Sequence, residues 1–321
     1  MSELVAGKGV DLVEVPIDLL SPENATDVAL YLMMNGEMVL YKKAGVYLPR
    51  GRIDKLVKQG VKVFYLQKEM VGHFLERTGE EIRQMLLSHK PSIQELKNVH
   101  KKLTDFSASL LAVPSQETIE LSVEVAGSLA ECIEKNEDIS TQVLFLMEKD
   151  IATSIHITNV HFLVAGFSHF MGYRGDELRR MSAMGMLHDV GKAMVPDFIL
   201  RKPGKLTDEE FEEIKKHTLY GRDILRNNGA DEFIPAALCH HENIDGTGYP
   251  MGLKYEDIPK EALVVKVCDI YEALTGYRPY RNPFKPFAAA KLMVEEFVKE
   301  KKALPMDIME KFIAFVGAAK L

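Results

Sequence analysis

The sequence of 321 residues has an ordinary globular composition, with 46% hydrophobic and 27% charged residues and a formal net charge of −7. This composition excludes disordered, collagen-like and disulfide-scaffold proteins, and the length predicts about two domains. Because the net charge is negative, there is no general positive field for a nucleic-acid polymer, and an anionic ligand needs local cations. Three cysteines without CxxC spacing, no signal-peptide pattern and no apolar stretch near ~18 residues predict a cytoplasmic protein without a membrane segment.

Residues 1–75 predict a small α+β domain. Asn35-Gly36 separates two segments of β-type patterning, and this dipeptide is the strongest short signal for a hairpin. Gly60 is expected to end a helix, and the segment after it is rich in β-branched and aromatic residues, as strands are. The expected strands are 28–34, 37–41, 45–48 and 61–66, and the expected helix is 52–59.

Residues 76–138 predict a helical connector. Over 93–110, apolar residues recur at steps of three and four, which is typical of a coiled-coil seam. The seam either packs on neighbouring helices of the same chain or pairs two copies; we favour the first, and a homodimer stays open. A second amphipathic helix is expected over 117–134. The seam residues are Leu96, Val99, Leu103, Phe106 and Leu110.

Residues 139–321 predict helices joined by short loops, and seven of the ten histidines lie between 156 and 241. Several of them continue apolar runs, so their side chains are expected to point inward. His217 is expected to end a helix that a capping box at Thr207 opens. His161 and His169 lie off the apolar stripe of their helix and are expected to be structural or exposed. The inward candidates are His156, His188, Asp189, His217, His240, His241 and Asp269.

Five inward imidazoles and two inward carboxylates are costly to bury without compensation, and metal coordination uses their nitrogen and oxygen atoms directly. Seven ligands are too many for one ion with an open position, so two ions bridged by a carboxylate are expected. The lack of thiolate ligands disfavours a structural zinc site and favours iron or manganese, although ligand type excludes neither zinc nor nickel. Lys192, one turn beyond His188, offers a point charge suited to phosphate. Cys239 and Cys268 are expected to pack in the core.

These residues resemble the HD-GYP subfamily of the HD-superfamily phosphohydrolases, over roughly residues 140–321. The resemblance implies an all-α HD-type domain with bacterial cyclic di-GMP phosphodiesterase activity. We therefore expect a mainly α protein, with a small α+β input domain (1–75), a helical connector (76–138) and an HD-GYP domain (139–321). The matching segments are His188–Lys192, Leu200–Thr207, His217, His240–Pro250, Asp269–Thr275 and Arg278–Arg281.

The resemblance also implies roles for single residues. His156, His188, Asp189 and Asp269 would hold one metal, and His217, His240 and His241 the second, with Asp189 and a water or hydroxide bridging them. Lys192 would meet the scissile phosphate, and Gly248, Tyr249, Pro250 and Arg278 would line the substrate pocket. Members with a third metal carry a glutamate four residues before the first histidine, where this chain has Ala152. Two ions are therefore expected, and the linear dinucleotide pGpG is favoured over GMP as the product.

The expected reaction is metal-assisted hydrolysis of a phosphodiester bond of cyclic di-GMP. Three alternatives stay open: a different cyclic dinucleotide such as cyclic GMP-AMP as substrate, a non-catalytic dinucleotide receptor, and a di-iron site that activates oxygen. The family architecture implies that the N-terminal module regulates the hydrolase, by sensing an input or by binding a partner such as a diguanylate cyclase or another signalling protein.

Overall fold

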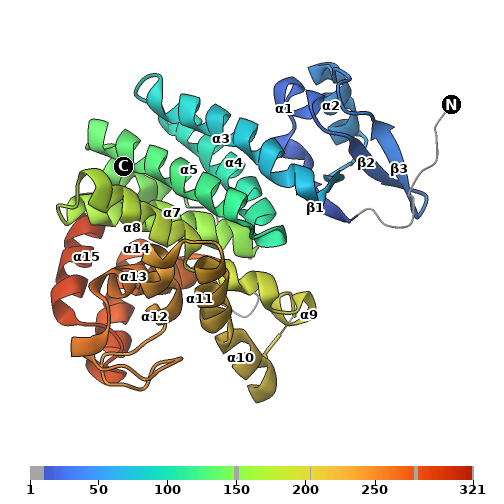
Figure 1. Cartoon of the computed structure of the whole chain (residues 1–321). Helices are drawn as coiled ribbons and strands as arrows, with labels where there is room; N and C mark the ends of the chain where they lie inside the picture. The colour runs from blue at the N-terminus through green and yellow to red at the C-terminus, as the bar shows by residue number, and fades with distance from the viewer. Residues whose placement is uncertain (1–10, 148–151, 203, 278–280, 320–321) are drawn as a thin grey trace.

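The computed structural model describes residues 11–147, 152–202, 204–277 and 281–319. A small lobe with a β-sheet lies beside a larger helical body, and long helices join the two (Figure 1). The fold class expected from the sequence is confirmed: the protein is mainly helical, with an α+β part near its N-terminus. The domain boundaries at 75 and 138 stay predictions. In the described part of the chain, no helix is long and apolar enough to cross a bilayer.

The lobe contains one antiparallel sheet with the strand order β1-β4-β2-β3. Asn35 and Gly36 connect β2 to β3 with φ angles of 52° and 83°, which are the positive values that a tight hairpin turn needs. The predicted hairpin is therefore confirmed. The elements of the lobe are β1 (Leu12–Pro16), α1 (Pro22–Thr26), β2 (Leu30–Met34), β3 (Glu37–Lys42), α2 (Arg50–Lys58) and β4 (Val63–Gln67).

The strand expected over 45–48 is wrong, because this stretch forms a loop. The buried ammonium of Lys42 donates to the carbonyls of Thr26, Lys43 and Val46 at 3.1, 2.9 and 2.9 Å. Carbonyls that accept from a lysine need no neighbouring strand, so local side-chain chemistry replaces a sheet ladder here. Strand β1 was not predicted from the sequence. It pairs with β4 along its whole length.

Three long helices lead from the lobe into the body: α3 (Val71–Leu87), α4 (Ile93–Ala112) and α5 (Gln116–Lys135). All five residues of the predicted α4 seam are fully buried, and α4 packs against α3 and α7 (Thr153–Phe170). The seam therefore packs within its own chain, as favoured from the sequence. A homodimer stays a prediction.

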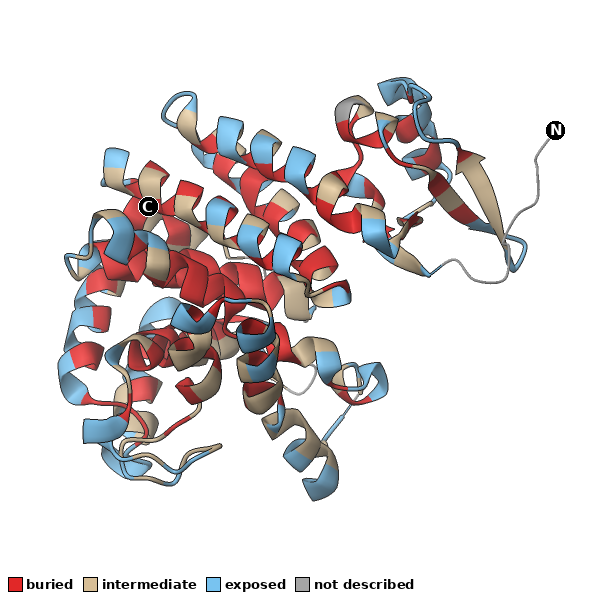
Figure 2. Ribbon diagram, viewed as in Figure 1, coloured by how far each residue is buried: buried red, intermediate tan, exposed pale blue. Residues whose placement is uncertain are grey.

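The centre of the body is α7, which is buried on every side over Ile155–His169 (Figure 2). A helix buried all round has no single inward stripe, so stripe position does not distinguish ligands from other residues. His161 and His169 are both buried and thus structural, and His161 Nε2 lies 2.9 Å from Ser182 Oγ. The other α-helices of the body are α6 (Ile139–Gln142), α8 (Gly175–Leu187), α9 (Asp197–Leu200), α10 (Asp208–Lys215), α11 (His217–Asn227), α12 (Ile234–Cys239), α13 (Lys260–Thr275), α14 (Pro286–Leu292) and α15 (Met306–Ala318), and a π-helix, η7 (Met293–Glu300), follows α14.

Burial gives His161 a measurable acid sensitivity. Burial, with a smaller contribution from His100, lowers the pKa of His161 from 6.5 to about 3. A group whose pKa is depressed on folding is protonated only in the unfolded chain as the pH falls, so stability is lost from about pH 6.5 downward. We expect the burial of His161 to lower the free energy of unfolding by about 2 kcal/mol at pH 5 relative to pH 8. Urea unfolding of His161→Phe should show a pH dependence shallower by that amount, and an unchanged dependence would contradict the prediction.

Candidate metal centre

The seven candidate ligands come together at the middle of the helical body. They are brought there by α7, the α8–η4 junction, the start of α11, the end of α12 and α13, where η4 is the short 3₁₀ turn Val190–Met194. The side chains form two groups, and within each group the ligand atoms lie within 4.8 Å of one another. One group is His156, His188 and Asp189, and the other is His217, His240 and His241.

His217 reaches this centre differently from the prediction. It begins α11 rather than ending α10, and Phe211, which the spacing argument used, is 46% exposed. The capping box of Thr207 and Glu210 is present, but α10 ends at Lys215. His217 is buried because η4 lies directly against the first turn of α11. A Cβ on Gly191 would lie 1.9 Å from the carbonyl oxygen of His217, so only glycine permits this approach.

Hydrogen bonds orient four of the five imidazoles. In each of these rings Nδ1 faces an oxygen that only accepts, so Nδ1 carries the proton and the Nε2 lone pair is left free. The lone pairs face the centre between the rings, and metal-binding histidines typically donate their other ring N–H to a carbonyl or carboxylate oxygen in this way. The acceptors are Gly185 O for His188 (2.8 Å), Ile214 O for His217 (2.6 Å), Ala236 O for His240 (2.9 Å) and Glu272 Oε2 for His156 (2.6 Å).

Asp189 lies between the two groups and faces both. Its Oδ2 is 3.3 Å from Nε2 of His156 and of His188. Its Oδ1 is 3.3 Å from His217 Nε2 and 3.8 Å from His240 Nε2. Among the described residues, Asp189 Oδ1 and His188 Nε2 are buried with no hydrogen-bond partner. Ligands held at about 2.1 Å around one ion lie about 3.0–3.4 Å from each other, so these spacings fit metal coordination.

Asp269 completes the set, with Oδ1 3.3 Å from His156 Nε2. Burial opposes a charge on His156, but the carboxylates of Glu272, Asp189 and Asp269 outweigh it and raise the pKa of this histidine well above 6.5. The carboxylates at this end of the site therefore stabilise a positive charge, which either a proton on His156 or a bound cation can supply. At the other end, burial lowers the pKa of His240 to about 3. Burial also lowers the pKa values of His217 and His241, so these imidazoles are neutral and able to ligate at neutral pH.

Glu272 is a site residue that the ligand search in the sequence missed. It is fully buried on α13, and it accepts from His156 Nδ1 and from Asn159 Nδ2 at 3.0 Å. One signal was available: an acidic residue three positions after Asp269 lies on the same side of an apolar helix. Cys239 and Cys268 pack in the core as expected, and burial raises the pKa of Cys239 to about 12.

Lys192 and the glycine-rich loop border the centre. The ammonium of Lys192 pairs with Asp189 Oδ2. The ring of Tyr249 stacks on His241, with centroids 4.7 Å apart and planes 21° apart. A Cβ on Gly248 would lie 2.2 Å from the backbone nitrogen of Asn243, so the loop folds back tightly on itself. Tyr249 and Pro250 are joined by a cis peptide bond. Arg278, the remaining predicted pocket residue, lies outside the described residues.

The loop is held by two buried charged residues. Glu242 accepts from the backbone nitrogens of Met251 and Leu253 at 2.7 and 3.0 Å. Lys266 donates to Glu242 O and to Asn243 Oδ1 at 2.6 and 2.8 Å. The sequence indicated neither partner of Lys266, because the contact joins α13 to a loop more than twenty residues away. Asp245 accepts from the backbone nitrogen and the hydroxyl of Thr247, and these bonds shape the loop.

A cavity of about 460 Å³ opens beside the histidines. His241, Tyr249 and Asp269 form part of its wall, so the loop and the candidate ligands share one space. Its cationic side chains suit an anionic ligand, and its aromatic faces suit planar bases. Lys215 Nζ lies 5.0 and 5.6 Å from the ring centroids of Phe211 and Tyr249. The other lysines and rings of the wall are Lys266, Lys301 and Phe297.

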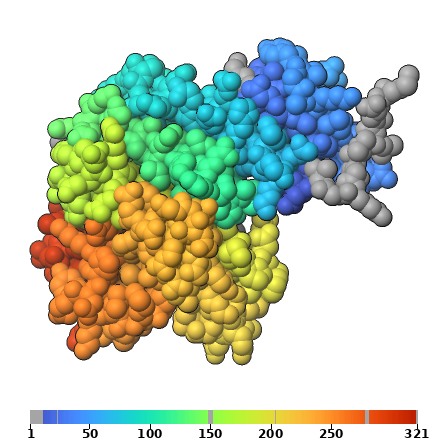
Figure 3. Space-filling model, viewed as in Figure 1, coloured from blue at the N-terminus to red at the C-terminus, as the bar shows by residue number. Residues whose placement is uncertain are grey.

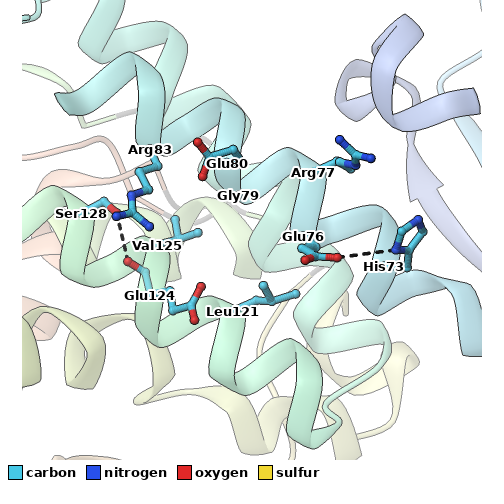
Figure 4. Close-up of a pocket in the computed structure, with 10 residues that line it drawn as sticks. All are labelled: His73, Glu76, Arg77, Gly79, Glu80, Arg83, Leu121, Glu124, Val125 and Ser128. Carbon is cyan, nitrogen blue, oxygen red and sulfur yellow. Dashed lines mark hydrogen bonds and ion pairs between the residues drawn. The ribbon is translucent and has the colours of Figure 1, made fainter. Parts of the chain in front are cut away.

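A second hollow, of about 320 Å³, lies between α3 and α5 (Figure 4). Basic and acidic side chains alternate along it, so it has no net preference for an anion or a cation. None of the seven candidate ligands lines it. Its charged residues are His73, Arg77, Arg83, Glu76, Glu80 and Glu124.

Comparison with known proteins agrees with this geometry. A model of the HD domain family matches residues 138–299. A cyclic di-GMP phosphodiesterase of Thermotoga maritima is 38% identical over 185 residues, covering 55% of this chain and 50% of the relative. The cyclic di-GMP phosphodiesterase response regulator RpfG of Xanthomonas campestris is 34% identical, covering 54% and 47%. A 3′3′-cGAMP-specific phosphodiesterase of Vibrio cholerae is 36% identical, covering 41% and 26%.

The chain thus spans about half the length, or less, of these curated relatives. Among solved structures, Bd1817, an HDG"Y"P protein from Bdellovibrio bacteriovorus, superposes with a TM-score of 0.67. The two share 18% identity, and the match covers 96% of this chain and all of the other. At this identity the likeness shows a common fold.

Proposed function

Because the chain belongs to the HD-domain family, we propose that it hydrolyses a phosphodiester bond of cyclic di-GMP with bound divalent metal ions. The observation that carries the proposal is the convergence of imidazole lone pairs and carboxylate oxygens around Asp189, beside a cavity with lysines and aromatic rings. Relatives named as cyclic di-GMP phosphodiesterases support the substrate class.

The donor set suits two divalent ions, for which we propose iron first and manganese second. One would be held by His156, His188, Asp189 and Asp269, and the other by His217, His240 and His241, with Asp189 bridging. Such ions supply an acidified water and neutralise charge on a phosphate. At the position of a third-metal glutamate stands Ala152, the residue that precedes α7 and has no ligand atom in its side chain. We therefore propose pGpG as the product.

The remaining residues of the site position the nucleotide. With metal bound, both carboxylate oxygens of Asp189 would face an ion. Lys192 would therefore release Asp189 and move its ammonium to the scissile phosphate. Tyr249 and Phe211 offer rings to the bases, and Lys215 and Lys301 offer charges to the phosphates. The lysines of the cavity explain how a protein of net charge −7 accepts an anionic dinucleotide. Gly248, Pro250 and Arg278 stay proposed pocket residues.

Anaerobic incubation with cyclic di-GMP and Fe²⁺ or Mn²⁺, followed by chromatography and a metal count, tests the proposal. We expect conversion to pGpG. Metal-loaded protein that leaves cyclic di-GMP intact would overturn it. The same assay with 3′3′-cGAMP tests the second candidate substrate, which relatives named as cGAMP-specific phosphodiesterases favour. Binding of either nucleotide without turnover would instead indicate a receptor.

Lys266 provides a prediction about substrate binding. In Lys266→Met the loop loses the two bonds from the ammonium to Glu242 O and Asn243 Oδ1. A hydrogen bond to a charged group contributes about 1.5–3 kcal/mol, so we expect KM for the dinucleotide to rise about tenfold or more with a smaller change in kcat. Lys260→Met, on the exposed start of the same helix, is the matched control. An unchanged KM would show that the loop does not depend on Lys266.

We also propose that the N-terminal lobe regulates the hydrolase, by sensing an input or by binding a signalling protein such as a diguanylate cyclase. Its position supports this role, because the lobe contacts α3 and α4. It lies away from the region of residues 211–303, which includes the cavity wall (Figure 3). Full activity and an unchanged response to partners after deletion of residues 1–75 would contradict it. The cytoplasmic location of the protein stays a prediction.

A further inference from the structure

A chain of buried polar side chains leads from α4 to the candidate metal centre. His100 Nε2 on α4 lies 2.8 Å from Asn159 Oδ1 on α7. Asn159 Nδ2 lies 3.0 Å from Glu272 Oε1 on α13, and Glu272 Oε2 lies 2.6 Å from Nδ1 of His156. His100, Asn159 and Glu272 are each at most 1% exposed. Three helices thus meet through one hydrogen-bonded path that ends on a proposed ligand.

The direction of every bond in this path follows from its chemistry. A carboxylate only accepts, so Asn159 presents its amide nitrogen to Glu272 and its carbonyl oxygen to His100. The proton of His100 therefore lies on Nε2, and the proton of His156 lies on Nδ1. With Nδ1 protonated, the lone pair of His156 Nε2 is available to a metal ion held between it and the carboxylates of Asp189 and Asp269, each 3.3 Å away. The path thus determines both the tautomer and the direction of the ring.

Because the side chains of this path are buried, each of them depends strongly on its hydrogen-bond partners. A buried polar group that loses its partner costs about 1–3 kcal/mol, more when it is charged, so the side chains stay together or move together. If His100 shifts, the oxygen of Asn159 loses this donor, and the amide is held less firmly against Glu272. Glu272 would then hold the imidazole of His156 less firmly.

The other side of α4 contacts the lobe. α4 packs against β1 and against the 3₁₀ turn Ile17–Leu19 that follows it. Lys101, the residue after His100, pairs with Asp18 in that turn at 2.8 Å. Both α4 and the lobe lie outside the segment 138–299 that matches the HD domain family. One helix therefore contacts the lobe on one side and begins the path to His156 on the other.

We propose that His100 is a positioning residue for the metal centre: through Asn159 and Glu272 it holds the imidazole of His156 in its ligating orientation, so that metal retention depends on how α4 packs. This inference rests on the proposed metal centre. A residue outside the segment that matches the family would thus help to build the site inside that segment. It also gives the lobe a physical route to the centre, since a movement of β1 and its turn displaces α4.

The test measures retention of Mn²⁺, supplied alone, by the full chain against a competing chelator. His100→Phe keeps an aromatic ring, somewhat larger than imidazole, and removes the donor, and we expect a several-fold faster loss of Mn²⁺. His100→Gln supplies an amide N–H where the imidazole had one, and we expect partial rescue. Glu272→Gln lies one step nearer to the ligand, where such changes cost about 10–100-fold in metal affinity. His161→Phe is the matched control, because its imidazole is equally buried but bonds to Ser182.

The outcomes separate the positioning role from general packing. Equal loss of Mn²⁺ from His100→Phe and His161→Phe would overturn the role, and so would retention by His100→Phe equal to that of the wild type. If His100→Phe does not fold, Asn159→Leu interrupts the same path from α7 and is read in the same way. A wild-type chain that binds neither Mn²⁺ nor, under anaerobic conditions, Fe²⁺ would overturn the metal centre itself, whereas normal wild-type binding with an unaltered His100→Phe would overturn only the positioning role.

Discussion

Asp189→Asn is expected to abolish turnover and to remove most of the bound metal while the chain stays folded. Both oxygens of Asp189 are within 3.8 Å of histidine nitrogens from the two ligand groups, so this carboxylate is shared by both. An amide keeps the shape, but it lacks the charge and presents a donor where a cation belongs. Metal analysis, chromatography with cyclic di-GMP and circular dichroism of the same preparation check the prediction. Asp189→Ala and His188→Ala should behave alike.

Asp231→Asn is the control for this change. Its carboxylate is exposed and pairs with Arg226 on the surface, so the loss of one negative charge should leave metal and turnover unchanged. Wild-type turnover by Asp189→Asn would remove Asp189 from the mechanism. Loss of turnover with a full metal content would assign it to substrate chemistry instead of metal binding.

Gly191→Ala is expected to have the largest effect on stability. The added Cβ would lie 1.9 Å from His217 O and 2.3 Å from the backbone nitrogen of Gly221. Backbone atoms cannot rotate away as a flexible side chain does, so η4 must separate from α11. We expect the free energy of unfolding to fall by about 3 kcal/mol, with loss of metal, because η4 and α11 place Asp189 and His217. Urea unfolding and metal analysis measure both effects.

Gly221→Ala tests the same contact from the opposite side. Here the nearest atoms to the new Cβ would be Ala237 Cβ at 3.4 Å and the backbone nitrogen of Gly191 at 3.5 Å, which are ordinary contact distances. Alanine is also favoured over glycine inside a helix by about 1 kcal/mol. Gly221→Ala should therefore be neutral or stabilising. Similar losses from both variants would show that the approach of η4 to α11 is not the cause.

The lobe shows which signals in the sequence are reliable. The hairpin at Asn35-Gly36 was predicted because positive φ angles select these residue types locally. The strand expected over 45–48 was wrong because the ammonium of Lys42 donates to the carbonyls of Val46 and Thr26, so Val46 needs no neighbouring strand. A side chain that replaces a sheet ladder leaves no periodic pattern to find.

The helices of the body show a related limit. Periodicity located α4 and α5 well, and the predicted seam of α4 is buried. On α7 the same reasoning singled out His156 over His161, although both are buried, because a helix surrounded by other helices has no exposed face to mark its orientation. His217 was placed in the centre on the evidence of Phe211, which is exposed, and its true cause is the close approach of Gly191.

Residue types and their local spacing were enough to indicate a helical metal site and to name seven candidate ligands, because imidazoles and carboxylates in apolar segments require a partner wherever they meet. The hydrolase activity was expected only from the resemblance to the HD-GYP subfamily. The tautomer of His156 and the path that leads to it from His100 depend on pairs of residues 59 to 116 positions apart. No local pattern encodes such pairs, because the fold alone brings α4, α7 and α13 into contact. The order of the residues thus predicts which side chains can bind metal. Their orientation toward one centre arises from the packing of helices that are distant in the sequence.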